Sequence, residues 1–168
     1  MKRLIFLLTL CLLLPLPQEA SAKNTGRAMV RLADEFRHED GVEVTDLGRI
    51  ALSLMRAAAK ASASSRDEKA VLAAFTGITR LVVVDCEDAP DEVRKDFAER
   101  ARKLLRKEEI LLEAKDRGDL IRIYGSLSET GEEIRDIIIF NEGGGGLVCA
   151  FGTVPTSFLE RVKRKAKR

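Results

Sequence analysis

The densest group of side chains able to do chemistry is the tetrapeptide Asp85-Cys86-Glu87-Asp88. It places three carboxylates and a thiol at the end of a strongly apolar stretch, where a predicted strand passes into a predicted helix. Functional side chains often lie in such connections, because a rigid scaffold positions the loops. Carboxylates there could bind Ca²⁺ or Mg²⁺, or one of them could act as an acid with a raised pKa.

A structural interpretation of the same residues is favoured. Asp88 precedes Pro90, and a single carboxylate at that position is enough to cap the following helix. The spacing lacks the Asp-x-Asp-x-Asp-Gly order of a calcium loop, and Cys86 as a nucleophile would need a base beside it. Asp85, Glu87 and Asp88 are therefore the only metal-ligand candidates, and no catalytic or cofactor-binding residue is predicted.

Two cysteines, Cys86 and Cys149, raise the question of a disulfide. They could pair in an oxidising compartment, but a pairing cannot be deduced from sequence alone. Both lie in predicted strands, so two buried, small, apolar side chains are the simpler interpretation.

The sole histidine and the glycine run carry no recognisable site. His38 lies in a charged helix end, where the helix dipole accounts for an imidazole, and a metal site led by two histidines is impossible. The run 142–146 is followed neither by Lys-Ser/Thr nor by a helix, as a phosphate-binding loop would be. A flexible hairpin tip is predicted instead.

The first 22 residues have the three parts of a secretory signal peptide. Lys2-Arg3 is followed by an apolar run from Leu4 to Leu14, and then by Ala20-Ser21-Ala22. The apolar run is shorter than the ~20 residues that span a bilayer. We expect cleavage after Ala22 and a periplasmic or secreted protein. Cys11 lies inside the apolar run, so a lipoprotein is not expected.

Composition limits the classes of partner. The chain has 168 residues, of which 45% are hydrophobic and 33% charged, and this excludes a disordered protein. A net charge of +2 gives no long-range field toward nucleic acid or an anionic membrane. With seven Phe, one Tyr and no Trp, the chain also lacks the usual platforms for base stacking. No nucleic-acid partner is predicted.

The first half of the mature chain reads as helices around two strands. Residues 23–28 are expected to form a flexible leader, and a helix follows from Met29 to a stop at Gly41. A short strand at 42–44 precedes a second helix ending near Lys60, a loop at 62–67 and a helical piece at 68–75. A buried strand at 78–86 and a helix opened by Pro90 complete this half.

The second half is predicted to be a β-meander. Extended runs at 110–115, 120–127, 134–141 and 147–154 are separated by short connections that contain glycine. Helices first and strands last indicate the α+β class. We expect one domain over 29–160, with a mixed, mostly antiparallel sheet, three or four helices packed on one face and a C-terminal β-meander.

The chain ends in a basic tail, residues 161–168. Six of its eight residues are basic, namely Arg161, Lys163, Arg164, Lys165, Lys167 and Arg168. Such a block could bind anionic lipid headgroups or lipopolysaccharide at a membrane surface. Phe158 and Leu159 are the neighbouring apolar anchors.

The order of these features resembles the DUF4252 family of exported bacterial proteins. The resemblance lies in the signal peptide, the strand Gly41-Val42-Glu43-Val44, the helix around Ala51–Met55, the strand Gly77–Val84, the segment Leu111–Lys115 with its meander, and the ending Phe151–Val154. It implies a domain of unestablished function with no catalytic residues to carry over. Some members are lipoproteins, and this sequence departs from that. Members are often encoded near extracytoplasmic sigma factors, and this implies a role in envelope signalling.

The sequence therefore predicts a soluble, non-enzymatic binding or interaction domain that works with an envelope protein or ligand and needs no cofactor. Two alternatives stay open. One is an enzyme or divalent-metal-binding protein with a carboxylate site at Asp85–Asp88. The other is a membrane-surface protein that docks through its basic tail.

Overall fold

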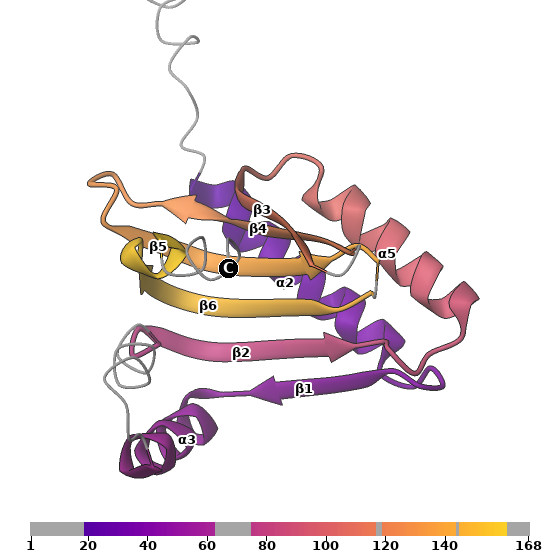
Figure 1. Cartoon of the computed structure of the whole chain (residues 1–168), viewed down its shortest axis with the longest axis horizontal. Coiled ribbons are helices and arrows are strands. Elements are labelled where there is room, and N and C mark those ends of the chain that lie inside the picture. The colour runs from indigo at the N-terminus through magenta and orange to yellow at the C-terminus, as the bar shows by residue number, and fades with distance from the viewer. Residues whose placement is uncertain (1–18, 63–74, 117–118, 144, 161–168) are drawn as a thin grey trace, which may run out of the picture.

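Figure 1 shows a computed structural model of the chain, which describes residues 19–62, 75–116, 119–143 and 145–160. The elements in these ranges, in chain order, are α2 (Glu19–Phe36), β1 (Glu43–Leu47), α3 (Arg49–Ser62), β2 (Ile78–Asp85), α5 (Asp91–Leu105), β3 (Ile110–Asp116), β4 (Asp119–Leu127), β5 (Glu133–Asn141) and β6 (Leu147–Pro155). A helical turn over 157–160 follows β6.

The six strands form one sheet in the order β1-β2-β6-β5-β4-β3. All five pairings between these strands are antiparallel. The predicted α+β class is confirmed, and β3 to β6 form the predicted meander. The sheet is not mixed, because β2 joins the meander through an antiparallel pairing with β6.

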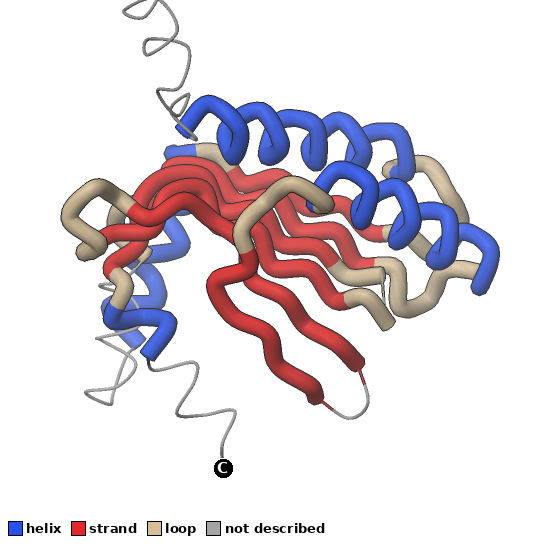
Figure 2. Tube along the Cα trace, turned by 90° about the horizontal axis from the view of Figure 1, so that it is seen from above, coloured by secondary structure: helices blue, strands red, loops and turns tan. Residues whose placement is uncertain are grey.

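Helices α2 and α5 cover one face of the sheet (Figure 2). Residues on α5 at helical spacing, Phe97, Ala101 and Leu105, are buried because they point at α2 and the sheet. Phe97 meets Phe36 of α2 edge to face, with 5.3 Å between ring centroids. Burying a phenylalanine of this kind contributes about 2–3 kcal/mol to folding.

The opposite face carries a row of aligned residues that crosses every strand and is apolar on all of them except β1, where Thr45 stands. The registers align Thr45, Val83, Val148, Ile139, Ile123 and Leu112 side by side. Helix α3 and the turn at 157–160 lie on this side, where Leu52 and Leu159 belong to one buried cluster. The expectation that the helices share one face is therefore wrong for α3. Only Gly48 separates α3 from β1, so the helix stays beside the end of that edge strand.

Four consecutive pairings in the sheet each contain a register shift. The shifts lie at Ile78/Arg80 between β2 and β6, at Arg135/Ile137 between β5 and β6, at Tyr124/Ser126 between β4 and β5, and at Ile110/Leu112 between β3 and β4. Because the paired residues are neighbours, the shifts form one line across five strands. A residue added to one strand bends it and increases its twist, which agrees with the curved sheet in Figure 2.

Helix α2 is longer than the sequence suggested. Residues 23–28, expected to be a flexible leader, are helical. The hydroxyl of Thr25 donates a hydrogen bond of 2.6 Å to Glu108, and Gly26 is buried against Phe151. These tertiary contacts hold residues 25 and 26 within the helix, which begins at Glu19. The predicted cleavage site after Ala22 thus lies within α2, whereas most of the signal peptide, the predicted loop at 62–67 and the helix at 68–75 fall largely outside the described residues.

Among the described helices, none has the length and apolar character needed to cross a bilayer.

Candidate functional site

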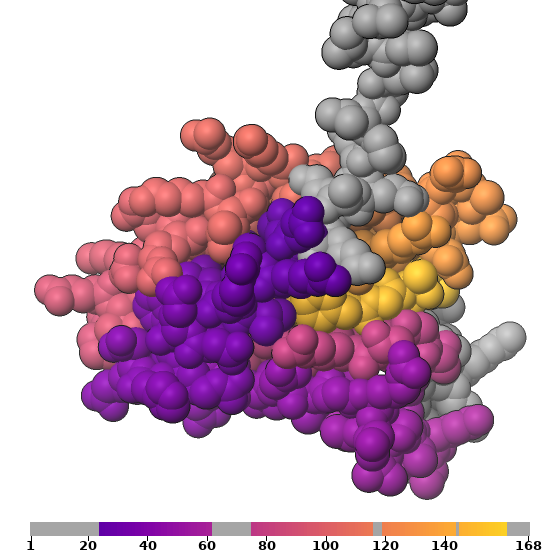
Figure 3. All heavy atoms as spheres, turned by 180° about the vertical axis from the view of Figure 1, so that it is seen from behind, coloured from indigo at the N-terminus to yellow at the C-terminus, as the bar shows by residue number. Residues whose placement is uncertain are grey.

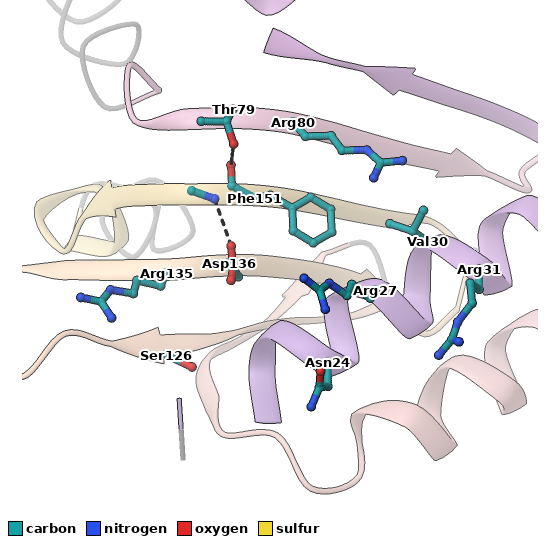
Figure 4. A pocket seen from close by; sticks show the side chains of 11 residues that line it. Asn24, Arg27, Val30, Arg31, Thr79, Arg80, Ser126, Arg135, Asp136 and Phe151 are labelled. Carbon is teal, nitrogen blue, oxygen red and sulfur yellow. Dashed lines mark hydrogen bonds between the residues drawn. The ribbon is translucent and has the colours of Figure 1, made fainter. Parts of the chain in front are cut away.

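A groove of about 990 Å³ lies between α2 and the sheet (Figure 4). Its helical wall consists of Asn24, Arg27, Val30 and Arg31. In Figure 3, β6 is visible at the surface beside α2, on the face that this helix only partly covers. The groove is therefore open to a ligand along the flank of one helix.

The floor and the second wall come from the line of register shifts. The strands contribute Thr79, Arg80, Ser126, Arg135, Asp136, Phe151 and Gly152. Neighbouring residues of a regular strand point to opposite faces, yet three pairs of sequence neighbours line this groove. A register shift changes the direction of a side chain. The same irregularities that bend the sheet thus concentrate polar side chains here.

Asp136 has an unusual backbone conformation that fixes this part of the groove. Its φ is 50°, in the left-handed region that non-glycine residues seldom adopt. The carboxylate accepts a hydrogen bond of 3.0 Å from the backbone N–H of Gly152. Gly152 itself has φ 125°, and a side chain there would clash with the carbonyl of Gly77. One hydrogen bond therefore joins a strained residue, Asp136, to a position on the neighbouring strand that only glycine can occupy.

Arg80 forms a fixed basic wall. Its guanidinium donates to both carboxylate oxygens of Asp46, at 3.0 and 2.6 Å, and lies 6.0 Å from the ring centroid of Phe151. The hydrogen bond from Arg80 lowers the pKa of Asp46 below its ordinary value. Arg80 is therefore held in a defined position at the groove, where Asp46 compensates its charge.

Arg27 and Arg31 supply the exposed charges of the groove. They lie one helical turn apart on the same side of α2, so both side chains reach the same space. Neither forms an ion pair with another described residue. Close packing of α2 on the sheet depends on Gly26, since a Cβ there would lie 2.7 Å from the Phe151 ring. Gly26 thus positions both arginines.

The lining contains more basic than acidic side chains. Four of the eleven lining residues are arginines, and Asp136 is the one carboxylate among them. Arginine stays protonated in proteins and binds carboxylate or phosphate with two parallel hydrogen bonds. Asn24, Thr79 and Ser126 add neutral hydrogen-bonding groups. The arrangement is suited to hold an anion and to orient it, rather than to move a proton.

The predicted carboxylate site at the end of β2 is not assembled. Asp85, Glu87 and Asp88 are exposed, and no group of three possible metal-ligating side chains occurs in the described ranges. Asp85 instead accepts a hydrogen bond of 2.9 Å from the backbone N–H of Glu87. The predicted cap is also wrong, because Pro90 is the N-cap of α5 and no side chain bonds to the helix end there. Asp88 lies two residues too early for that role.

The two cysteines are buried and unpaired. The register places Cys149 opposite Val82, four residues before Cys86. Four residues along a strand span about 13 Å, whereas a disulfide needs Cα atoms within ~7 Å. The candidate disulfide therefore does not form. Burial raises the pKa of the Cys86 thiol to about 11 and that of Cys149 to about 12.

The remaining sequence candidates are not brought into the groove. His38 is exposed in the turn after α2. The glycine run forms the tip of the β5–β6 hairpin, as predicted, with Gly145 at φ 68°. Beside this tip lies a smaller cavity of about 300 Å³, but its Arg102 pairs with Glu142 at 3.5 Å, so its charges compensate each other. The basic tail lies outside the described residues.

Sequence reasoning missed the groove because its residues come from five separate segments, namely α2, β2, β4, β5 and β6. The spacing of Arg27 and Arg31 was the one available signal, since residues four apart share a helix face. Arg135 and Asp136 both line the groove because of the register shift between β5 and β6. No sequence pattern indicated this shift. Comparison with protein-family models, curated proteins and solved structures found no match to the chain. The DUF4252 resemblance therefore stays a prediction.

Proposed function

We propose that the protein is a non-enzymatic binding domain of the cell envelope that holds an anionic ligand in the groove beside α2. The observation that carries this proposal is the gathering of Arg27, Arg31, Arg80 and Arg135 around a single open cavity. Within this group Arg80 pairs with Asp46, and arginines elsewhere in the described chain mostly pair with nearby carboxylates as well, as Arg122 does with Glu113 at 2.8 Å. Arg27 and Arg31 keep their charge available.

The ligand chemistry follows from the two exposed arginines. Residues four apart on a helix have Cβ atoms about 5–6 Å apart, so Arg27 and Arg31 can bind two oxygens of one anionic group or two neighbouring groups. Phosphate and carboxylate both fit the guanidinium fork. The Phe151 ring on the groove floor offers apolar contact beside them. The proposed ligand is therefore a small polyanion with an apolar portion.

The envelope location rests on the leader of residues 1–22. Cleavage after Ala22 would leave Lys23 at the new amino terminus, directly before the groove residue Asn24. The new ammonium group would add another positive charge next to the groove. Export and anion binding therefore support each other in this proposal.

The proposal is tested by calorimetric titration of the chain from Lys23 to Arg168 with pyrophosphate and, separately, with citrate. We expect binding that weakens as salt concentration rises, because exposed charges are screened. The double variant Arg27→Gln/Arg31→Gln should lower the affinity at least tenfold. The preferred probe distinguishes a phosphate-bearing ligand from a carboxylate-bearing one.

A matched control is Arg49→Gln, which removes an exposed arginine of α3 outside the groove. Its affinity should equal that of the unaltered chain. Two results would refute the groove as an anion site. One is that the Arg27→Gln/Arg31→Gln chain binds the probes as tightly as the unaltered chain, and the other is that the unaltered chain binds neither probe. Circular dichroism of each variant verifies that the fold is intact.

A further inference from the structure

Helix α3 is held to the body of the protein by very few side chains. Leu52 is its one buried large apolar residue. Next to it, the guanidinium of Arg56 donates to three backbone carbonyls, those of Leu52 at 3.0 Å, Thr76 at 2.7 Å and Ile78 at 3.1 Å. The inner side of α3 is thus attached mainly by polar contacts, and its apolar residues lie elsewhere.

The apolar residues of α3 face solvent. Ile50 is 79% exposed, Leu54 67% and Met55 53%. These are three of the five large hydrophobic side chains exposed within the described ranges. Ile50, Leu54, Ala57 and Ala61 have the spacing that aligns residues along one side of a helix. An exposed apolar stripe therefore runs along the outside of α3, opposite Leu52.

The charges of α3 are all positive. The helix carries Arg49, Arg56 and Lys60, and no acidic residue. By contrast, α5 contains both signs along its length. An exposed apolar stripe flanked only by basic residues is the pattern of helices that lie in the surface of an anionic membrane. Two copies of this chain would bring like charges together if they paired through α3.

The end of the described chain adds a second observation. Leu159 packs in the same cluster as Leu52, so the chain leaves the fold on the α3 side of the sheet. The eight residues that follow Glu160 include six basic ones. Figure 1 shows α3 at a corner of the molecule, beyond the edge strand β1. Helix α3 therefore lies at the periphery of the described fold.

We propose that α3 docks the protein on an anionic lipid bilayer, lying parallel to its surface. Ile50, Leu54 and Met55 enter the boundary between headgroups and acyl chains, while Arg49 and Lys60 contact lipid phosphates. With 14 residues, α3 is about 21 Å long, which gives an elongated footprint. The sequence after Glu160 adds six basic residues to the same chain, and basic residues near an anionic membrane surface favour binding to it. The site is separate from the groove, which opens on the opposite face of the sheet.

The test is co-sedimentation of the chain from Lys23 to Arg168 with vesicles. Mixed phosphatidylglycerol–phosphatidylcholine vesicles should bind it, and pure phosphatidylcholine vesicles should bind it at least tenfold more weakly. The variant Ile50→Ser/Leu54→Ser should lower partitioning into the anionic vesicles at least tenfold. Leu127→Ser, which removes an exposed leucine of β4, is the matched control and should leave partitioning unchanged.

A fluorescence measurement shows which segment enters the lipid. The chain contains no tryptophan, so Met55→Trp places a single reporter on α3 and Leu127→Trp a single reporter on β4. Anionic vesicles should shift the emission of Met55→Trp to shorter wavelength and leave that of Leu127→Trp unchanged. The groove variant Arg27→Gln/Arg31→Gln should bind vesicles normally, which separates this test from that of the proposed function.

Three results would overturn the proposal. One is the absence of binding to anionic vesicles. A second is that Ile50→Ser/Leu54→Ser binds normally while a chain ending at Glu160 does not, which would assign docking to the tail alone. The third is a concentration-dependent dimer that Ile50→Ser/Leu54→Ser converts to monomer, which would make a second copy of the chain the occupant of the stripe.

Discussion

Asp136 provides a sharp test of how the groove is held in shape. Its left-handed backbone costs a non-glycine residue about 1–2 kcal/mol, and its hydrogen bond to Gly152 returns about 1 kcal/mol. Asp and Asn tolerate this conformation better than other non-glycine residues. Substitutions at this position should therefore separate the energetic cost of the left-handed backbone from the stabilisation that the hydrogen bond provides.

Three variants give different expected stabilities. Asp136→Asn keeps an acceptor oxygen and should change the free energy of unfolding by less than about 0.5 kcal/mol. Asp136→Gly loses the hydrogen bond but relieves the backbone, so the two contributions nearly cancel, to within about 1 kcal/mol. Asp136→Ala loses the bond and keeps the strain, so it should be less stable than the unaltered chain by about 1 kcal/mol, and less stable than Asp136→Gly by about 1–2 kcal/mol, because only the glycine variant relieves the strain.

Urea denaturation followed by far-ultraviolet circular dichroism measures these differences. An Asp136→Ala chain as stable as the Asn and Gly variants would refute the reasoning, because it would show that neither the backbone strain nor the hydrogen bond matters. Asp136→Asn serves a second purpose. It removes the one carboxylate among the groove residues that the structure describes, so it should raise the affinity for pyrophosphate severalfold at nearly unchanged stability.

Three further predictions follow from other contacts. Arg56→Met should destabilise the fold by about 2–4 kcal/mol, since it deletes hydrogen bonds to three carbonyls, and hydrogen exchange should show α3 losing protection first. Cys86 and Cys149 should react with a thiol reagent at pH 8 only after unfolding, and mass spectrometry should find both reduced; rapid native labelling would contradict their burial. Asp46→Asn should cost at most about 1 kcal/mol at neutral pH, because the pair with Arg80 is largely exposed. The folded-state pKa of Asp46 is lowered. The pair with Arg80 therefore adds to the free energy of unfolding above the ordinary carboxyl pKa, and this addition is lost as pH falls through the lowered pKa. Urea titrations should accordingly give the same free energy of unfolding for the unaltered chain and Asp46→Asn in acid.

The meander was predictable because local chemistry determines it. Each of its strands is an extended run rich in apolar residues, which fits a sheet with buried side chains on both faces, and each connection contains a residue suited to a tight turn. Gly131, at φ 70°, is an example in the β4–β5 hairpin. Helix α5 was equally clear, since Pro90 marks its start and Phe97 and Ala101 repeat at helical spacing. The residues at the ends of such elements mark in the sequence where each element begins or ends.

Other features depend on tertiary contacts that no local pattern records. Helix α2 begins earlier than expected because Thr25 and Gly26 meet Glu108 and Phe151, which are far away in the chain. For α3, hydrophobic periodicity correctly predicted a helix but would have placed the stripe of Ile50 and Leu54 inward. The contacts of Arg56 reverse that orientation.

The candidate sites show the same contrast between what neighbouring residues in the sequence indicate and what tertiary contacts determine. Asp85, Glu87 and Asp88 were prominent because they are close in sequence, yet their side chains point to solvent instead of to a common centre. The groove arginines are scattered over the chain, so their meeting depends on sheet register and on the position of α2. Proximity along the chain was a poor guide to proximity in space.

The distribution of register shifts has a consequence for how the molecule opens. The five strands from β2 to β3 share the line of shifts, so none can move along its neighbour without disturbing the next pairing. The ladder between β1 and β2 is regular over five residue pairs and contains no shift. An edge strand of this kind can detach together with its helix while the other strands remain paired. We expect β1 and α3 to form the least protected unit in hydrogen exchange, leaving a five-stranded remainder that keeps its anion groove.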